Sequence, residues 1–230
     1  MVERSVVVTG GGGGLGGAVV GAFVEAGWRV VVPRRGDPAA SEPAADGLVR
    51  LTADLTDPAD VARVVAAAVA DPAAPLQAVV NLVGGYASGG LVHETPVEEF
   101  ERMLTVNLRP TYLVTQAALP HLVAAGGGAV VCVSARAAVT PFPGAVGYVT
   151  AKAAVLAFAN AVAVEYRSRN VRCNTVLPSV IDTPANRAAQ PDADHSRWVT
   201  PAEIAPVIRF LASTDSAPTT GATVPVYGRA

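Results

Sequence analysis

A tyrosine and a lysine stand four residues apart in the stretch Tyr148-Val149-Thr150-Ala151-Lys152. Residues at this spacing lie on the same face of a helix, about 5–6 Å apart at their Cβ atoms, so a phenol and an ammonium can share one site. Gly147 comes before the pair and a long run rich in alanine and valine follows it, which is typical of the start of a buried helix. A phenol beside an ammonium can exchange a proton with a substrate, because the positive charge stabilises tyrosinate.

Lys152 is the only lysine in the chain, since the other sixteen of its 17 basic residues are arginines. Lysine is a compact charge whose pKa shifts readily on burial, whereas arginine stays charged, so this position is chemically distinct. Chance is the alternative explanation, because one lysine placed at random would fall four residues after one of the five tyrosines in about 2% of placements. The rest of the chain has to decide between the two.

Composition limits the class of protein. With 230 residues, 51% of them hydrophobic and 16% charged, the chain is predicted to form one α/β domain over residues 1–230, and a disordered chain is excluded. A net charge of −2 gives no reason to expect nucleic acid or an acidic membrane surface as a partner. Cys132 and Cys173 lie in strand-like apolar runs without metal-ligand spacing, so we expect buried free thiols, no metal site and a reducing, cytoplasmic setting.

No segment is expected to target the protein to a membrane or to anchor it there. The N-terminus enters a strand by Ser5, so we predict no signal peptide. The most apolar helix, at about residues 150–166, contains Lys152, Asn160 and Glu165. We predict that this helix is too short and too polar to span a bilayer.

A glycine-rich stretch follows the first expected strand, the β-branched run Ser5–Thr9, and precedes an apolar helix that reaches about residue 26. Glycines let a backbone approach phosphate groups closely, and the helix N-terminus supplies free N–H groups and a positive dipole. The pattern therefore favours a dinucleotide site over a merely flexible loop. The residues expected to line this site are Gly10, Gly12, Gly13, Gly14, Leu15 and Gly16.

Two arginines follow the second expected strand, which covers residues 29–33. An acidic residue at this place binds the ribose 2′-hydroxyl of NAD, whereas an arginine accommodates the 2′-phosphate of NADP. Arg34 and Arg35 therefore favour NADP, with NAD still possible. The alternative is that both are solvated loop residues.

Strands and helices alternate through the remaining chain. Further strands are expected at residues 48–53, 76–83, 128–134, 171–177 and 222–226, and further helices at about 57–70, 97–124 and 201–213. Asp57 or Thr56 can cap the first of these helices, while Pro110 and Pro120 should interrupt or bend the second. The alternation predicts a Rossmann-type, doubly wound, seven-stranded parallel sheet with helices on both faces and ligands at the C-terminal ends of its strands.

At this point the chain resembles the short-chain dehydrogenase/reductase family in its compact single-domain form, over nearly its whole length. Residues 9–16 fit the family's TGxxxGxG loop, and residues 81–84 fit its NNAG turn with Leu82 in place of the second asparagine. Residues 174–183 look like the family's segment beside the nicotinamide, with Ser179 in place of the usual glycine. The resemblance implies that further residues contact the cofactor, namely Asp54 at the adenine, and Leu55, Asn81, Val83, Gly84, Tyr148, Lys152, Pro178, Val180 and Thr183.

The resemblance also implies a catalytic tetrad of Asn107, Ser134, Tyr148 and Lys152, and hydride transfer between a nicotinamide and a carbonyl or alcohol carbon. Tyr148 would act as general acid, with its pKa lowered by Lys152; a shift of about three units corresponds to ~4 kcal/mol. Ser134 would hydrogen-bond the substrate oxygen, and Asn107 would hold a water that links Lys152 to solvent. As alternatives, Ser134 simply ends a strand, and Asn107 caps or bends the helix at Pro110.

Clues to the substrate are few. The segment at about residues 184–200, which the family uses as a substrate lid, is short and polar, with Trp198 as its one large apolar residue. A short lid suggests an open pocket for a small ketone or aldehyde, or for a 3-oxoacyl thioester. The glycine-rich turn Gly84-Gly85-Tyr86 is unusual for the family and has no assigned role, while Arg136 is expected to face solvent rather than an anionic substrate.

The sequence therefore predicts an NADP-preferring oxidoreductase that interconverts a carbonyl and an alcohol. A redox-inactive NAD(P)-binding sensor is the alternative, although a sensor has no need of a proton donor. A sugar-nucleotide epimerase or dehydratase shares the Tyr–Lys pair but resembles longer chains. The helices at about residues 113–125 and 151–164 are apolar over a wide sector, so we also expect a homo-oligomer, a dimer or a tetramer.

Overall fold

One parallel sheet organises the molecule. The computed structural model describes residues 4–36 and 47–229. Its strands run in the order β3-β2-β1-β4-β5-β6-β7, which confirms the predicted fold class. They are β1 (Ser5–Thr9), β2 (Arg29–Arg34), β3 (Leu48–Thr52), β4 (Leu76–Asn81), β5 (Gly128–Val133), β6 (Val171–Pro178) and β7 (Thr223–Val226). The strand order reverses between β1 and β4, so a crevice for ligands is expected at the C-terminal ends of these strands.

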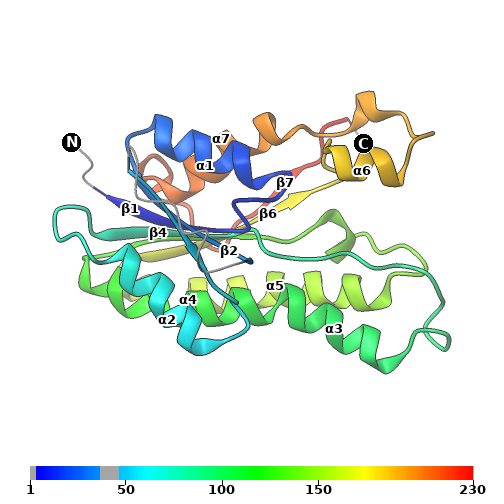
Figure 1. Ribbon diagram of the computed structural model, residues 1–230, viewed down its shortest axis with the longest axis horizontal. Coiled ribbons are helices and arrows are strands. Elements are labelled where there is room, and N and C mark those ends of the chain that lie inside the picture. Colours follow the sequence, from blue (N-terminus) through cyan, green and yellow to red (C-terminus); the bar gives the residue numbers. More distant parts are fainter. Residues whose placement is uncertain (1–3, 37–46, 230) are drawn as a thin grey trace.

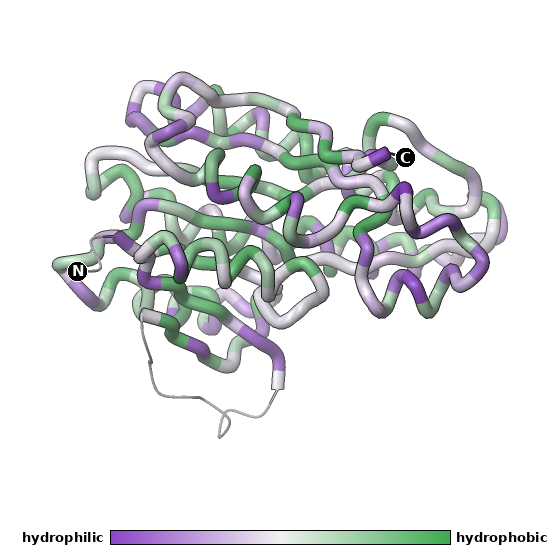
Figure 2. The backbone as a smooth tube through the Cα atoms, turned by 90° about the horizontal axis from the view of Figure 1, so that it is seen from above, coloured by the Kyte–Doolittle hydropathy of each residue, from purple (hydrophilic) through white to green (hydrophobic). Residues whose placement is uncertain are grey.

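Helices cover both faces of the sheet (Figure 1). Helices α1 (Gly16–Glu25) and α7 (Pro201–Ala212) lie on one face, and α2 (Pro58–Ala68), α4 (Arg109–Ala124) and α5 (Val146–Glu165) lie on the other. Strand β1 shows why both faces are covered, because Val7 packs into one core cluster while Val6 and Val8 pack into the other. In Figure 2 the hydrophobic colour follows the strands through the middle of the molecule.

Local sequence signals set several helix boundaries. The Asp57 side chain accepts a hydrogen bond from the Ala59 N–H at 2.9 Å, and Pro58 opens α2, which confirms Asp57 as the cap. At α7 the side chains of Thr200 and Glu203 bond each other's backbone N–H groups and form a capping box. Each cap satisfies N–H groups that the first helical turn leaves unpaired.

The long helical region expected at 97–124 divides into α3 (Val97–Asn107) and α4, with Leu108 between them. The interruption falls just before Pro110, as predicted. An interruption at Pro120 was wrong, because α4 continues through that residue to Ala124. Pro120 lies on the exposed side of the helix, where water can bind the carbonyl that the missing N–H leaves free.

Helix α5 is longer than the sequence suggested. It begins at Val146 and has 20 residues, so it is long and apolar enough to span a membrane by length and composition alone. The prediction that its length excludes such a span was therefore wrong. In the fold it packs beside α3: a Cβ added at Gly147 would lie 3.1 Å from the Met103 Cγ atom. Its buried residues, including Val155 and Ala159, belong to one of the two cores.

Candidate active site

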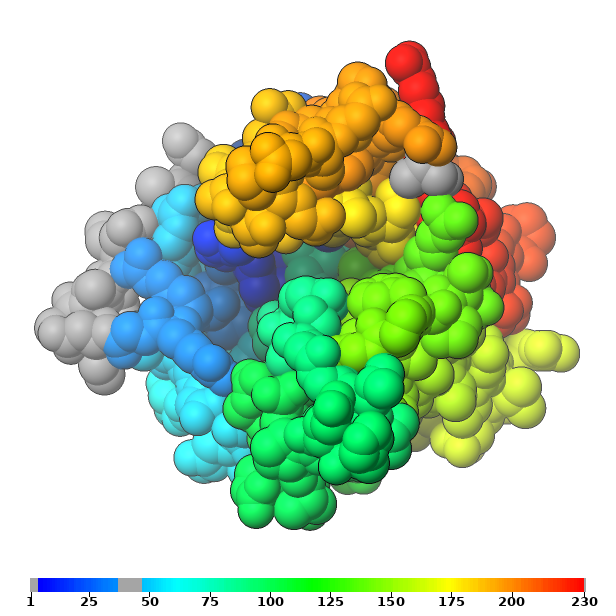
Figure 3. Space-filling view, turned by 90° about the vertical axis from the view of Figure 1, so that its right-hand side faces the viewer, coloured from blue at the N-terminus to red at the C-terminus, as the bar shows by residue number. Residues whose placement is uncertain are grey.

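A hollow opens at the end of the sheet that faces the viewer in Figure 3. The blue glycine-rich segment, the orange segment near residues 185–200 and the green chain between β4 and α5 border it. These segments follow the C-terminal ends of β1, β4, β5 and β6, so the chain brings the predicted site residues to one place.

The glycine loop has the shape of a phosphate cradle. Gly10 has a φ of +69°, and a Cβ at Gly16 would lie only 2.1 Å from the Gly10 carbonyl oxygen, so both positions require glycine. Gly12 is exposed and has open space around it. The first turn of α1 has no side-chain cap and no acidic residue, so the positive end of its dipole is not neutralised, while the Gly16 and Gly17 N–H groups bond the Gly13 carbonyl oxygen at 3.0 and 3.4 Å. These residues fit the pyrophosphate of a dinucleotide.

Two other predicted segments lie against this loop. The Thr9 hydroxyl accepts hydrogen bonds from the N–H groups of Leu82 and Val83 at 3.0 and 3.4 Å, which joins the turn after β4 to the end of β1. A Cβ at Gly14 would lie 2.6 Å from the Thr183 methyl carbon. The turn after β4 and the segment after β6 therefore both reach the glycine loop.

Asn81 and Leu55 face the protein interior rather than the crevice. Asn81 is 2% exposed, and its amide donates to the Thr115 hydroxyl at 3.0 Å, so it joins β4 to α4. Leu55 is 6% exposed and packs in the core between the sheet and α2. A cofactor contact through either side chain stays a prediction that this packing does not favour.

A carboxylate and a guanidinium lie together where β2 and β3 end. The Asp54 carboxylate accepts hydrogen bonds from the Thr56 N–H at 2.9 Å and from its hydroxyl at 2.8 Å. These bonds, with a smaller contribution from the nearby Arg35, lower the pKa of Asp54. Arg34 is the last residue of β2, and Arg35 is exposed beyond it. The adenosine end of a dinucleotide would therefore meet charges of both signs.

Ser134 and Lys152 clasp the end of β5 to α5. The Ser134 hydroxyl donates to the Lys152 carbonyl oxygen at 2.7 Å, and the Lys152 ammonium donates to the Val133 carbonyl oxygen at 3.1 Å. Both residues are buried, at 3% and 6% exposure. The Ser134 hydroxyl thus bonds the helix backbone in the protein by itself, and its hydrogen bond to a substrate oxygen stays a prediction.

Asn107 is fully buried at the end of α3. Its side-chain amide forms hydrogen bonds with the main chain of the turn after β4. The Oδ1 atom accepts from the Gly85 N–H at 3.2 Å, and the Nδ2 group donates to the carbonyl oxygens of Gly85 and Met103 at 3.0 and 2.9 Å. The side chain therefore fixes the Gly84–Tyr86 turn. The water that Asn107 was predicted to hold stays a prediction.

Gly84 is the point where this turn meets the lysine. A Cβ at Gly84 would lie 2.5 Å from the Asn107 Oδ1 atom and 3.1 Å from the Lys152 Nζ atom. Three predicted site residues therefore converge here, and the absence of a side chain on Gly84 makes the approach possible.

Burial moves the pKa values of the Tyr–Lys pair toward the neutral forms of both groups. Loss of solvent, and secondarily the neighbouring Tyr86, raises the pKa of Tyr148 to about 12. Burial lowers the pKa of Lys152 to about 8, partly offset by Cys132. The Nζ atom lies 6.0 Å from the centroid of the Tyr148 ring. The expectation of a lowered pKa for Tyr148 was therefore wrong, because loss of solvent raises it in the protein by itself.

Beyond β6 the chain turns without the glycine that the family pattern has. The Ser179 hydroxyl donates to the Tyr227 carbonyl oxygen at 2.7 Å, and Asn170 is the one non-glycine residue with a positive φ among residues 4–36 and 47–229. Pro178 ends β6, and the Val180 carbonyl oxygen accepts from the Val199 N–H at 3.3 Å. Serine is thus accommodated at this position.

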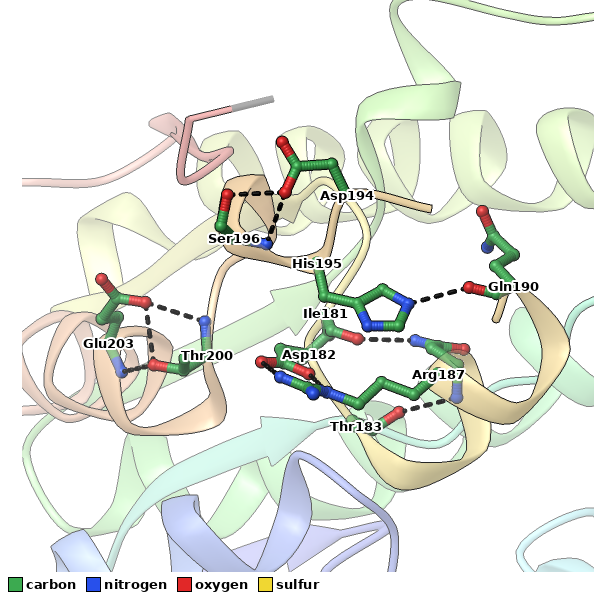
Figure 4. A network of polar contacts seen from close by, with 11 residues as sticks. Ile181, Asp182, Thr183, Arg187, Gln190, Asp194, His195, Ser196, Thr200 and Glu203 are labelled. Atoms are coloured by element: carbon green, nitrogen blue, oxygen red, sulfur yellow. Dashed lines mark hydrogen bonds and ion pairs between the residues drawn. The ribbon is translucent and has the colours of Figure 1, made fainter. Parts of the chain in front are cut away.

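The segment predicted as a lid contains a helix that the sequence analysis missed, α6 (Pro184–Ala189). Thr183 caps it, accepting from the Asn186 N–H at 3.2 Å, and the dipeptide Thr183-Pro184 was the sequence signal for it. Figure 4 shows the polar network that holds the segment: Arg187 pairs with Asp182, and His195 Nε2 lies 2.8 Å from the Gln190 carbonyl oxygen.

Tyr86 is a site residue to which the sequence analysis gave no role. Its ring packs edge to face against the Tyr148 ring, with 5.0 Å between centroids, and the residue is 60% exposed. Tyr148 itself is half-buried. The unusual glycine-rich turn directly after β4 was the signal that could have identified it.

Comparison with known proteins identifies the family. The family model described as short chain dehydrogenase matches residues 4–194. The chain belongs to the short-chain dehydrogenase/reductase family. The family's enzymes are NAD(P)-dependent oxidoreductases that act on an alcohol or a carbonyl group, and the glycine loop and the Tyr–Lys pair described above fit that chemistry.

Relatives of this family with related activities span the whole chain. The 2-(R)-hydroxypropyl-CoM dehydrogenase of Xanthobacter autotrophicus is 33% identical over 99% of this chain and 98% of its own. The 3-oxoacyl-[acyl-carrier-protein] reductase MabA of Mycobacterium tuberculosis is 32% identical over 99% of this chain and 92% of its own.

Solved structures of family members superpose closely on this one. A short-chain type dehydrogenase/reductase from Mycobacterium ulcerans has a TM-score of 0.91 at 27% identity and covers 100% of this chain and 90% of its own. ElxO with NADP bound has a TM-score of 0.89 at 25% identity and covers 99% of this chain and 98% of its own.

Proposed function

We propose that this enzyme reduces a small carbonyl compound, with NADPH as its preferred cofactor and Tyr148 as its proton donor. The observation that carries the proposal is the geometry of the pair, in which the Lys152 Nζ atom lies 6.0 Å from the centroid of the Tyr148 ring. A phenol with a pKa of about 12 keeps its proton at neutral pH, and a lysine with a pKa of about 8 keeps its charge. A protonated acid beside a cation suits reduction, in which the carbonyl oxygen gains negative charge and needs a proton.

Reduction of a carbonyl needs a hydride at the carbon and a proton at the oxygen. A bound nicotinamide cofactor would supply the two electrons and the hydrogen that reach the carbonyl carbon. Tyr148 gives its proton to the carbonyl oxygen, and the Lys152 ammonium stabilises the tyrosinate that remains. The hydrogen bonds of Ser134 and Lys152 hold α5 against the end of β5. Because Tyr148 lies on the same helix, the acid is positioned before a substrate arrives.

Two arginines support the cofactor preference. Arg34 and Arg35 lie at the end of β2, next to the strand that leads into the glycine loop, where the adenosine ribose would lie. A guanidinium binds a phosphate through charge-assisted hydrogen bonds, and a ribose 2′-hydroxyl offers it no charge. The NADP-bound relative ElxO is in keeping with this preference.

Replacement of Arg35 with alanine is expected to weaken NADPH binding about 10- to 100-fold, the loss expected for charge-assisted hydrogen bonds, and to leave NADH binding nearly unchanged. Quenching of tyrosine and tryptophan fluorescence by each cofactor measures both affinities. Arg169→Ala is the matched control, because this exposed arginine precedes β6 at the opposite end of the sheet. An equal loss for both cofactors would refute the assignment of Arg35 to the 2′-phosphate.

The function itself is tested by a cofactor titration followed by a carbonyl panel. We expect tighter binding of NADPH than of NADH, and consumption of NADPH with at least one small ketone, aldehyde or 3-oxoacyl thioester. Binding of neither cofactor would remove the oxidoreductase proposal. Binding without turnover on a broad panel would favour the redox-inactive sensor.

We also propose that the enzyme works in the cytoplasm as a homo-oligomer. Cys132 and Cys173 are buried free thiols, which suits a reducing compartment.

The homo-oligomer is supported by an exposed apolar face. Tyr112 on α4 and Val164 on α5 are 45% and 69% exposed, and the Tyr112 ring packs edge to face with Phe158 of α5 at 5.9 Å. Such an apolar face suits pairing with a second copy. Light scattering is expected to give a multiple of 23.3 kDa; a 23.3 kDa particle would contradict the oligomer.

A further inference from the structure

The turn that carries Tyr86 is fixed by the buried side chain of Asn107. Asn107 binds both the N–H and the carbonyl group of Gly85, and a Cβ at Gly85 would lie 3.3 Å from a methyl carbon of Val106. The Asn107 amide also bonds the Met103 carbonyl, so its own orientation is set by α3. The Tyr86 main chain is therefore held in place while its side chain projects outward.

The same turn is joined to the loop after β5. The Gly89 N–H donates to the Gly144 carbonyl oxygen at 2.8 Å, and a Cβ at Gly144, whose φ is +80°, would lie 3.2 Å from the Gly89 carbonyl oxygen. Phe142 lies two residues before Gly144 and is 44% exposed. Two loops with exposed aromatic rings are thus joined through their backbones beside the proton donor.

An exposed aromatic ring in a fixed position is available for contact with a ligand. Tyr86 is 60% exposed although its ring packs at 5.0 Å, edge to face, against the ring of Tyr148. The neighbouring polar side chains have other partners: the Ser134 hydroxyl bonds the Lys152 carbonyl, and the Asn107 amide bonds Gly85. A substrate whose oxygen reaches Tyr148 would therefore lie against the Tyr86 ring.

We propose that Tyr86 is a substrate-contacting residue whose ring forms one wall of the substrate site, and that this wall favours carbonyl compounds with a flat conjugated group beside the carbonyl carbon. Aromatic rings attract each other in offset-stacked and edge-to-face arrangements more than equal apolar area alone provides. The inference rests on the proposed function, because it takes Tyr148 as the group that meets the substrate oxygen. It adds a substrate class to that function.

A pair of matched alcohols tests the wall without turnover. Calorimetry on NADPH-saturated enzyme, in which an alcohol offers no carbonyl to reduce, compares 1-phenylethanol with 1-cyclohexylethanol, which differ in the flat ring. We expect the wild type to bind the phenyl compound about two- to tenfold more tightly, the range that an aromatic contact supplies. Tyr86→Leu is expected to abolish this preference. Tyr86→Phe, which keeps the ring, is expected to retain it, and so is the control Phe210→Leu, which removes a 44% exposed ring from α7.

The outcomes separate this proposal from the proposed function. Equal binding of both alcohols by the wild type, or a preference that survives Tyr86→Leu, would overturn the wall. A preference lost in Tyr86→Phe would also overturn it, because the hydroxyl rather than the ring would then be responsible. A binding preference that depends on Tyr86, with no NADPH consumption on any member of the carbonyl panel, would support the wall and contradict the function. With turnover present, Tyr86→Leu should raise KM for acetophenone more than kcat changes, whereas Tyr86→Phe and Phe210→Leu should leave KM near the wild-type value.

Discussion

Replacement of Tyr148 with phenylalanine is expected to lower kcat for carbonyl reduction about 10²- to 10⁴-fold, the range that a positioned acid contributes. The substitution removes one hydroxyl and keeps the ring that packs at 5.0 Å against Tyr86, so the fold and the wall of the site remain. NADPH affinity should change little. Steady-state absorbance at the nicotinamide band, together with a binding titration, measures both quantities.

Tyr166→Phe is the matched control for this variant. Tyr166 follows the last residue of the same helix, α5, far from the Lys152 end, and its removal should leave kcat unchanged. Full turnover in Tyr148→Phe would overturn the mechanism. A loss of NADPH binding equal to the loss of kcat would instead give Tyr148 a role in cofactor binding and not in proton transfer.

Replacement of Lys152 with methionine is expected to abolish most activity and yet to stabilise the protein by about 0–2 kcal/mol at pH 7. Burial lowers the pKa of this ammonium from 10.5 to about 8, which corresponds to about 3 kcal/mol of destabilisation when both states are charged. Against that gain, the variant leaves the Val133 carbonyl without its hydrogen bond, at a cost of about 1–3 kcal/mol. Methionine keeps the length of the side chain.

The dependence of stability on pH makes this prediction specific. Between pH 8 and 10.5 the unfolded chain holds the Lys152 proton and the folded chain has lost it, so the stability of the wild type contributed by this group rises with pH. Below pH 8 the cost of burying the charge is fully present. The advantage of Lys152→Met in urea unfolding should therefore shrink by about 3 kcal/mol from pH 7 to above pH 10.

Arg169→Met is the matched control for the pH dependence. This arginine is exposed, so its removal takes no charge out of the protein interior and should shift stability equally at both pH values. A constant difference between Lys152→Met and the wild type from pH 7 to above pH 10 would show that the buried ammonium is not destabilising, and would contradict the account of Lys152.

The sheet and the place of the site were predictable because each rests on short stretches of sequence. The β-branched run Ser5–Thr9 can only be a strand buried on both faces, and the glycines after it need positive φ or close backbone approach at particular positions such as Gly10 and Gly16. The pair Tyr148 and Lys152 is fixed by helical spacing. These signals are local, so no knowledge of tertiary contacts was needed.

The direction in which each side chain points was not predictable, because it depends on contacts between residues far apart in the chain. Ser134 bonds a carbonyl 18 residues away, and Asn107 bonds Gly85, which is 22 residues away. Either polar group could also have faced the crevice. Tyr86 could not be identified as part of the site from spacing, since it meets Tyr148 only after β4 and α5 have packed.

The pKa values were mispredicted for a related physical reason. The sequence shows that a cation lies near a phenol, and an opposite charge lowers the pKa of tyrosine. It does not show that both groups are buried. In the fold desolvation outweighs the charge, so the pKa of Tyr148 rises and that of Lys152 falls. The result is an acid that holds its proton until substrate is present.

The transfer of a labelled hydrogen tests the central claim most directly. NADPH that carries deuterium at the reactive C4 position of its nicotinamide is mixed with enzyme and the best carbonyl substrate of the panel, and the alcohol is examined by mass spectrometry and NMR. We expect one deuterium on the former carbonyl carbon of each alcohol molecule, and about 10²- to 10⁴-fold less labelled alcohol in a Tyr148→Phe sample taken at the same early time. Tight NADPH binding with no labelled alcohol from any member of the panel would contradict the assignment of this site to carbonyl reduction.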